Sequence, residues 1–146
     1  MELFMSLHQL IYQSRETRTL SNQDFSDILE VARKFNESQG ITGCLFYNGG
    51  WLLQVLEGEQ SVIDSLYQKI ARDERHKDCN LMYFEPVEKR VFSKWTMGMI
   101  NLETEKNSKY SELKSAMDEF KTGKVAVPLA IKLFRIFTHD FTAKSI

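Results

Sequence analysis

The sequence of 146 residues lacks most of the short patterns that mark a common enzyme chemistry. It contains neither the G-x-G-x-x-G pattern of dinucleotide-binding enzymes nor a phosphate-binding loop. Its three histidines, His8, His76 and His139, show no metal-ligand spacing, and neither Ser14 nor Ser61 lies in a nucleophile motif. These absences argue against conventional hydrolysis and against metal catalysis.

Cysteine, net charge and long apolar runs are also scarce. The two cysteines, Cys44 and Cys79, form no C-x-x-C pair and follow no secretory signal, so we expect free buried thiols in a reducing compartment. With 19 Lys plus Arg against 20 Asp plus Glu, no global field recruits nucleic acid or an anionic membrane. No apolar stretch approaches the roughly 20 residues of a membrane span. We therefore predict a soluble, cytoplasmic domain without nucleic-acid or membrane partners.

What the sequence does contain is a regular succession of strand and helix patterns. Ser21, with Asp24 three residues later, is a good helix N-cap, and Asn48-Gly49-Gly50 has the chemistry of a hairpin turn. The alternation of apolar residues predicts strands over residues 7–14, 43–48, 51–57, 80–87 and 95–101. The helical periodicity predicts one helix over residues 22–36, ended by Gly40, and a second whose apolar stripe is Val62, Ile63, Leu66 and Ile70.

The resulting β-α-β-β-α-β-β order predicts an α+β fold, a ferredoxin-like sandwich with two helices on one face of the sheet. Two further helices are expected over residues 108–121 and 127–137, and the second of these is apolar nearly all round. We expect them to pack on the other sheet face or at a subunit interface, which favours a homo-oligomer. The predicted division is a domain over residues 1–102 and a helical extension over residues 103–146 that is not a separate domain.

Gln54 is the least expected residue in this pattern, because it lies in the middle of the apolar run Trp51-Leu52-Leu53-Gln54-Val55-Leu56. Both faces of such a strand are expected to be buried, and an unpaired amide there would cost on the order of 1 to 3 kcal/mol. Asn36 is a second such amide, because it lies in line with Phe25 and ends the apolar stripe of the first helix. If the first and third strands are neighbours, Tyr12 and Gln54 can face the same helices. For each residue alone, a satisfied hydrogen bond in the core is a sufficient explanation.

Taken together, these residues belong to a pattern that resembles the BLUF family of blue-light receptors, which use FAD. The matching segments follow the family's order and spacing over residues 7–102. They are Leu10-Ile11-Tyr12-Gln13-Ser14, Asn36, Gly40-Ile41-Thr42-Gly43, Leu53-Gln54-Val55-Leu56-Glu57-Gly58, Arg72-Asp73-Glu74-Arg75-His76 and Trp95-Thr96-Met97. A match of this extent is specific, and it implies that residues 1–102 form a flavin-binding photosensor domain.

The resemblance implies that FAD binds noncovalently, with its ring between the two helices. The residues that would surround the flavin are Tyr12, Ile28, Asn36, Gln54, Lys69, Ile70, Asp73 and His76. Ile28 and Ile70 would pack on the faces of the ring, Asn36 would bond its polar edge, and Lys69, Asp73 and His76 would line the ribityl and phosphate end. Two positions depart from the family: Phe35 replaces a frequent polar residue, and Lys69 replaces a frequent arginine. Both could alter flavin affinity or colour.

The resemblance also implies a photochemical switch in place of enzymatic turnover. Tyr12 would give an electron and then a proton to the flavin, and Gln54 would relay the proton and rearrange its hydrogen bonds, which shifts the absorption to the red. The amide suits this role because its acceptor and donor ends are nearly equal in size. Trp95 and Met97 match the fifth-strand residues that adjust near the glutamine. The signal would pass from them through the C-terminal helices to a downstream signalling protein or to a change of oligomer.

The residues also leave two other functions open. An acylphosphatase-like hydrolase of the same fold could place Arg15 or Arg18 around an anion, and it would release phosphate. A flavin-free interaction module could use the apolar C-terminal segment for assembly. Its preparation would be colourless, and Gln54 would be an ordinary core amide.

Overall fold

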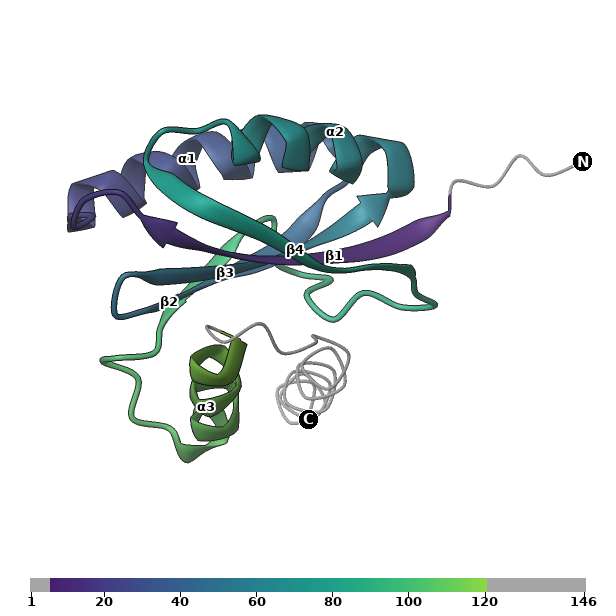
Figure 1. The fold of residues 1–146 in the computed structure, drawn as a ribbon. Coiled ribbons are helices and arrows are strands. Elements are labelled where there is room, and N and C mark those ends of the chain that lie inside the picture. Colours follow the sequence, from purple (N-terminus) through teal and green to yellow (C-terminus); the bar gives the residue numbers. More distant parts are fainter. Residues whose placement is uncertain (1–5, 121–146) are drawn as a thin grey trace, which may run out of the picture.

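The computed structural model describes residues 6–120, which form one five-stranded sheet with helices on both faces (Figure 1). The strands are β1 (Leu7–Glu16), β2 (Thr42–Asn48), β3 (Trp51–Glu59), β4 (His76–Pro86) and β5 (Gly98–Asn101), in the order β4-β1-β3-β2-β5. Only the β2–β5 pair is parallel among them. Helices α1 (Asn22–Gln39) and α2 (Gln60–Ala71) cover one face, and α3 (Ser111–Phe120) lies on the other. The predicted ferredoxin-like α+β fold is confirmed.

Local sequence signals explain where α1 begins and ends. The Ser21 side chain accepts a hydrogen bond from the Asp24 backbone, and the Asp24 carboxylate accepts one from the Ser21 backbone, so the predicted capping box is present. The helix continues three residues beyond Asn36, because Gly40 is the first residue there to adopt the left-handed conformation, with a φ of 68°. The helix therefore ends at the glycine, as the sequence predicted.

The segment 95–97 was wrongly predicted as part of the fifth strand. β5 is short and begins only at Gly98, because the preceding backbone groups bond elsewhere. The Trp95 carbonyl accepts from the Gly43 backbone at 3.0 Å, and the Thr96 carbonyl accepts from the Asn36 side chain at 2.7 Å. The Met97 carbonyl accepts from the Arg33 guanidinium at 2.9 Å. Alternating apolar residues thus imitate a strand in a segment that side chains of α1 hold in place.

Other boundaries also differ from the sequence prediction. β4 begins at His76, four residues before the predicted start, and its pairing with β1 is irregular at two points. The predicted helix over residues 108–121 starts as a 3-10 turn, Ser108–Tyr110, and continues as α3. The predicted helix over residues 127–137 lies outside the described residues.

Strand alternation divides the core into two layers, one on each face of the sheet. The layer under α1 and α2 contains Leu10, Tyr12, Leu20, Phe25, Leu52, Leu56 and Ile63, among others. The layer under α3 contains Ile11, Phe46, Leu53, Val55, Leu113 and Met117, among others. Both faces of β3 are therefore buried, as predicted. Tyr12 and Gln54 point to the helical side as direct cross-strand partners.

Glu57 is a fully buried carboxylate in β3, close to the layer under α3. It accepts hydrogen bonds from the backbone of Val91 at 2.7 Å and of Phe92 at 2.9 Å. It also accepts from the side chains of Gln9 and Thr42, both at 3.1 Å. Four donors meeting one carboxylate fix the segment that leads from β4 towards β5 against the middle of the sheet.

Replacing Glu57 by Gln should lower the free energy of unfolding by about 1–3 kcal/mol, because the new NH₂ group faces backbone donors and leaves a buried group unpaired. Urea unfolding measures the difference. Glu85→Gln makes the same chemical change at an exposed site of β4 and should change stability by less than about 0.5 kcal/mol. Equal effects of the two substitutions would show that the carboxylate is not required.

Candidate functional site

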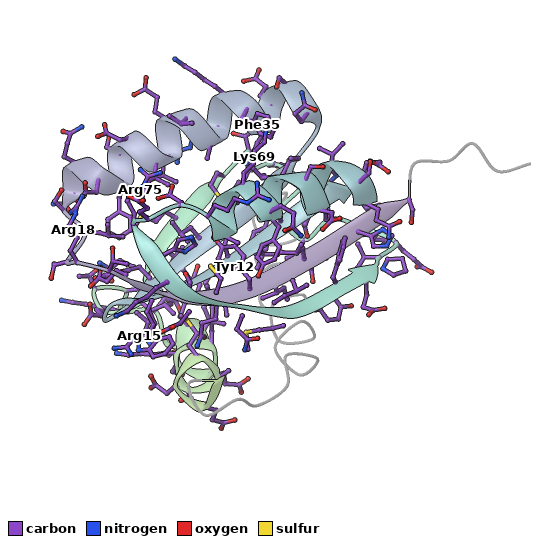
Figure 2. All side chains as sticks on the ribbon, turned by 45° about the horizontal axis from the view of Figure 1, so that its top comes forward. Tyr12, Arg15, Arg18, Phe35, Lys69 and Arg75 are labelled. Atoms are coloured by element: carbon purple, nitrogen blue, oxygen red, sulfur yellow. The ribbon has the colours of Figure 1, made fainter. Side chains whose placement is uncertain are left out.

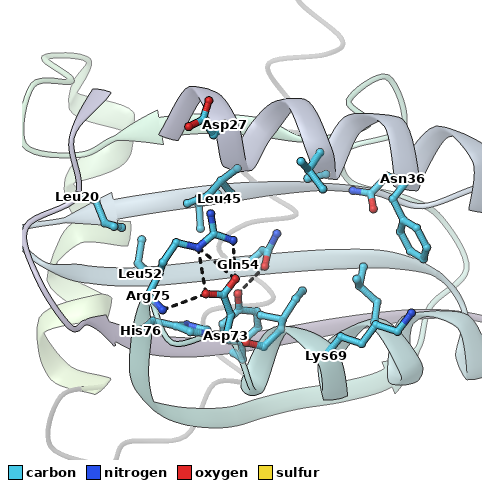
Figure 3. Close-up of a pocket in the computed structure, with 17 residues that line it drawn as sticks. Leu20, Asp27, Asn36, Leu45, Leu52, Gln54, Lys69, Asp73, Arg75 and His76 are labelled. Carbon is cyan, nitrogen blue, oxygen red and sulfur yellow. Dashed lines mark hydrogen bonds and ion pairs between the residues drawn. The ribbon is translucent and has the colours of Figure 1, made fainter. Parts of the chain in front are cut away.

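A pocket of about 320 Å³ lies between α1 and α2, with the sheet as its floor (Figure 3). Most of its lining is apolar: Leu20, Ile28, Val31, Ala32, Phe35, Leu45, Leu52, Leu66 and Ile70. The polar or charged residues in the lining are Tyr12, Asp27, Asn36, Gln54, Lys69, Asp73, Arg75 and His76. An apolar slot with a few convergent polar groups is typical of a site for a small organic ligand.

At the floor of the pocket, Tyr12 and Gln54 meet across neighbouring strands. The Tyr12 hydroxyl donates to Gln54 Oε1 at 2.5 Å, and Gln54 Nε2 donates to Met97 Sδ at 3.4 Å. The oxygen end of the amide therefore has a strong donor, while the nitrogen end has only a thioether, which is a weak acceptor. The two hydrogen bonds of the amide are therefore unequal in strength, and Nε2 can donate a second hydrogen bond.

Burial raises the pKa of Tyr12 well above the ordinary value of 10.0, and nearby Cys79, Tyr67 and Asp73 add to the increase. The ring of Tyr67 packs against that of Tyr12 with centroids 5.3 Å apart. Because the phenol keeps its proton over the physiological range, Tyr12 is a permanent donor to Gln54 in the resting protein.

Asn36 presents an unsatisfied acceptor at the pocket. Its nitrogen donates to the Thr96 carbonyl at 2.7 Å, but its Oδ1 is buried and has no hydrogen-bond partner among the described residues. A buried amide oxygen without a partner is unusual and costly. A ligand with an N–H group at its edge would satisfy this oxygen, as the imide edge of a flavin can.

Charged residues line another part of the pocket. Arg75 forms an ion pair with Asp73 at 2.5 Å, and this contact holds the pKa of the Asp73 carboxyl below its usual range (Figure 3). Lys69 lies 5.7 Å from the centre of the Phe35 ring, a cation–π contact from α2 to α1 (Figure 2). Because Arg75 is paired with Asp73, Lys69 is the cationic group of the lining that could meet an anionic part of a ligand.

His76 is held on both sides of its ring. The Ile70 carbonyl lies 2.6 Å from Nε2, and the Ser14 hydroxyl lies 2.7 Å from Nδ1. Because a carbonyl can only accept, Nε2 carries a hydrogen and Nδ1 can accept from Ser14. The imidazole is thus fixed at the pocket wall and tied to both β1 and α2.

All eight residues predicted to surround a flavin line this one pocket: Tyr12, Ile28, Asn36, Gln54, Lys69, Ile70, Asp73 and His76. The two predicted switch residues are separated. Met97 contacts Gln54, whereas Trp95 packs against the core layer under α3, with its ring 5.6 Å from that of Phe92. Their roles in binding and switching stay predictions.

Sequence reasoning missed two polar residues of the pocket. Arg75 lies within the segment Arg72-Asp73-Glu74-Arg75-His76, so its place in the motif was the available signal. Asp27 borders the pocket next to Ile28. No local pattern indicates this, because helical periodicity gives the direction of a side chain and not the width of the opening.

The guanidinium groups considered for an acylphosphatase-like site already have partners. Arg18 makes two hydrogen bonds to the Asp24 carboxylate, at 2.8 and 3.1 Å. Arg15 lies over the ring of Trp51, 4.9 Å from its centre. The two arginines line one hollow of about 240 Å³, but both guanidinium groups are already engaged, so these contacts do not favour the hydrolase alternative.

Comparison with known proteins gives one consistent result. Residues 7–98 match the family model described as BLUF, sensors of blue-light using FAD. The beta subunit of the photoactivated adenylate cyclase of Euglena gracilis is 38% identical over 93 residues, which are 63% of this chain and 11% of that subunit. This chain thus spans about one tenth of such cyclase subunits.

Solved structures with the same fold cover more of the chain. The dark-state structure of BlrB, a BLUF protein, has a TM-score of 0.73 and 29% identity, covering 94% of this chain and 99% of that one. The photo-activated state of BlsA has a TM-score of 0.75 and 28% identity, covering 90% of this chain and 94% of that one. A bacterial light-regulated adenylyl cyclase has a TM-score of 0.72 and 32% identity, covering 80% of this chain and 34% of that one.

The described part of the chain contains neither a membrane-spanning helix nor a cluster of metal ligands. Among residues 6–120, no helix combines the length and apolar character needed to cross a lipid bilayer. Within the same range, no three His, Cys, Asp or Glu side chains gather as metal ligands would.

The raised pKa of Tyr12 predicts that its phenol stays protonated at pH 10, where a tyrosine of the unfolded chain is half ionised. Because the folded state favours the neutral phenol, its contribution to stability is complete below about pH 10 and is lost as the pH rises through the folded pKa. The ¹³Cζ shift of labelled tyrosine, followed by NMR from about pH 7 to 11, measures the ionisation. Tyr12→Phe assigns the signal, and titration of that signal at or below pH 10 would contradict the prediction.

Proposed function

Because the chain belongs to the BLUF family of blue-light sensors that use FAD, we propose that it is a photoreceptor whose signal begins at the contact between Tyr12 and Gln54. The observation that carries this proposal is the 2.5 Å hydrogen bond between them at the floor of an apolar pocket. The cyclase activity of the longer relatives is not carried over, because the match covers only 11% of the subunit compared above. We propose a sensor and not a turnover enzyme.

The residues present suit a flavin. Ile28 from α1 and Ile70 from α2 line opposite helical walls of the pocket and would pack on the two faces of a flat ring. Asn36 Oδ1, which has no partner among the described residues, would accept from the N–H edge of the ring. Lys69 would serve the anionic phosphates, whereas Arg75 is already paired with Asp73. When bound, FAD supplies absorption of blue light and an excited state that can take an electron from a phenol.

Tyr12 and Gln54 then provide the switch. The phenol becomes strongly acidic when it loses an electron, and its proton already points at Gln54 Oε1. If the amide turns about its own axis or changes tautomer, the end that faces Tyr12 and the end that faces Met97 exchange hydrogen-bond polarity with little change in volume. A Glu at this position would instead bury a charge at considerable cost.

One rearranged hydrogen bond is worth about 0.5–1.5 kcal/mol, which changes a population roughly tenfold at most. The output therefore needs a segment that is already close to a balance between two arrangements. We propose the segment 95–97, because Met97 contacts Gln54 directly while neighbouring Trp95 belongs to the layer under α3. A shift in this segment can reach both sheet faces.

We further propose that residues 1–102 form the sensor unit, with residues 103–146 as its helical extension. In support, α3 buries Leu113, Ala116 and Met117 against the sheet, and Asn48 donates to Asp118 at 3.3 Å. The signal would leave by contact with a partner protein or by a change in a homo-oligomer. A cytoplasmic location agrees with free thiols at Cys44 and Cys79.

The purified protein, supplied with FAD, should show flavin absorption bands in the dark and a reversible shift to longer wavelength under blue light. The shift is expected because a changed amide at Gln54 alters the hydrogen bonds at the polar edge of the ring. Absorption spectra before and after illumination provide the measurement. A preparation that stays colourless after reconstitution with FAD would refute the proposal.

Tyr12→Phe and Gln54→Leu should each still bind flavin yet lose the light-induced red shift, since one removes the proton donor and the other the switching amide. Tyr47→Phe is a matched control: it removes a buried phenol of β2 that donates to Glu16 and does not line the pocket. The control should keep the shift. A normal shift in either of the first two variants would refute the role given to that residue.

A further inference from the structure

The outer edge of the sheet at β5 has features that flavin binding does not use. Within residues 6–120, β5 pairs with β2 alone, so its outer backbone groups have no strand partner in that range. β5 has only four residues, Gly98–Asn101, and all of them are partly exposed. A sheet edge of this kind can accept an added strand from another chain.

Two adjoining hollows flank this edge and meet at Arg33. One, of about 370 Å³, is lined by Arg33 and the segment 94–99. The other, of about 570 Å³, follows the outer flank of α1 and is lined by Asn22, Phe25, Ser26, Leu29, Glu30, Arg33 and Lys34. We call β5 and these two hollows the edge groove. Trp95 and Met99, both partly exposed, give it apolar surface beside a strand edge, whereas Met97 is buried beneath them.

The rim of the edge groove is positive. Arg33, Lys34 and Lys94 are all exposed. Glu30 is the one carboxylate among the residues that line the hollows, and it lies 3.6 Å from Lys34 in an exposed ion pair. The surface therefore has an excess of positive charge, although the whole chain has a net charge of −1.

Met97 connects the edge groove to the switch. Its sulfur accepts from Gln54, and its carbonyl accepts from the Arg33 guanidinium at 2.9 Å. A rearranged Gln54 amide changes one contact of Met97, and the backbone of the same residue holds a cation at the centre of the rim. Met97 therefore links the edge groove directly to Gln54, where the proposed hydrogen-bond rearrangement takes place.

We propose that the edge groove binds an extended acidic segment of a partner protein by strand addition, and that blue light changes its affinity. The light dependence rests on the proposed function; binding in the dark does not. Charge complementarity identifies the occupant, because acidic side chains would face Arg33, Lys34 and Lys94 while alternate apolar side chains would contact Trp95 and Met99. A second copy that presented the same positive rim would be repelled.

The test uses the full-length, flavin-loaded protein and two synthetic peptides of about eight residues. In one peptide Glu alternates with Val, and in the other Lys replaces each Glu. Titration followed by backbone NMR should shift the amides of Gly98–Asn101 with the acidic peptide and leave them unchanged with the basic one. Equal binding of both peptides, or of neither, would overturn the proposal. Shifts of the same amides on concentrating the protein alone would also overturn it, because they identify a second copy as the occupant.

Charge reversal gives the matched comparison. Lys34→Glu with Lys94→Glu should weaken binding of the acidic peptide about tenfold, since two attractive contacts become repulsive. Lys77→Glu with Lys114→Glu makes the same change in net charge at exposed sites outside the groove and should have an effect of less than about twofold. If the two double variants weaken binding equally, the effect comes from net charge and the assigned surface is wrong.

Illumination separates this inference from the proposed function. Wild-type protein should bind the acidic peptide with an affinity that differs about threefold or more between dark and light. Gln54→Leu should show the same affinity in the dark and in the light. A protein that shows the red shift but binds equally in both states refutes the light dependence alone. A protein without the red shift refutes the photoreceptor, while the dark binding still decides whether the groove is a docking surface.

Discussion

The site depends on the pairing of β1 with β3, which sets Tyr12 directly opposite Gln54. A shift of one residue in this register would turn one of the two side chains to the face under α3 and remove the hydrogen bond. The register is fixed on both faces of the sheet, because apolar side chains of β3 are buried under α1 and α2 on one face and under α3 on the other. Packing that has no photochemical role therefore sets the geometry of the switch.

Much of this arrangement could be predicted from sequence. The capping box at Ser21, the glycine that ends α1 and the alternation in β3 are local signals, and each one agrees with the structure. The order of elements then placed the first and third strands side by side, so the meeting of Tyr12 and Gln54 followed from topology. The eight predicted residues of the pocket lining followed from the family resemblance, since composition alone does not show which side chains face a cavity.

The parts of the fold and site that the sequence did not predict depend on long-range contacts, which a local pattern cannot show. The segment 95–97 has the alternation of a strand, but side chains of Arg33 and Asn36, some sixty residues earlier, take its carbonyls. For the same reason the sequence did not show that Trp95 and Met97 are separated: Trp95 packs against the core layer under α3, and Met97 belongs to the layer under α1 and α2. Arg75 escaped notice because its ion pair with Asp73 is a feature of the folded loop.

β3 carries two buried polar side chains three residues apart, and their contacts explain why we propose the switch at Gln54 and not at Glu57. Glu57 faces four donors, so any rearrangement would leave a buried charge or several donors unpaired. Gln54 has one strong donor at its oxygen and one weak acceptor at its nitrogen, so its alternative states differ by little more than a single hydrogen bond. The same strand thus provides a rigid anchor under the chain that leads to Trp95 and a responsive amide beside Met97. In the proposed mechanism, Gln54 can change its hydrogen bonds while Glu57 keeps the neighbouring backbone in place.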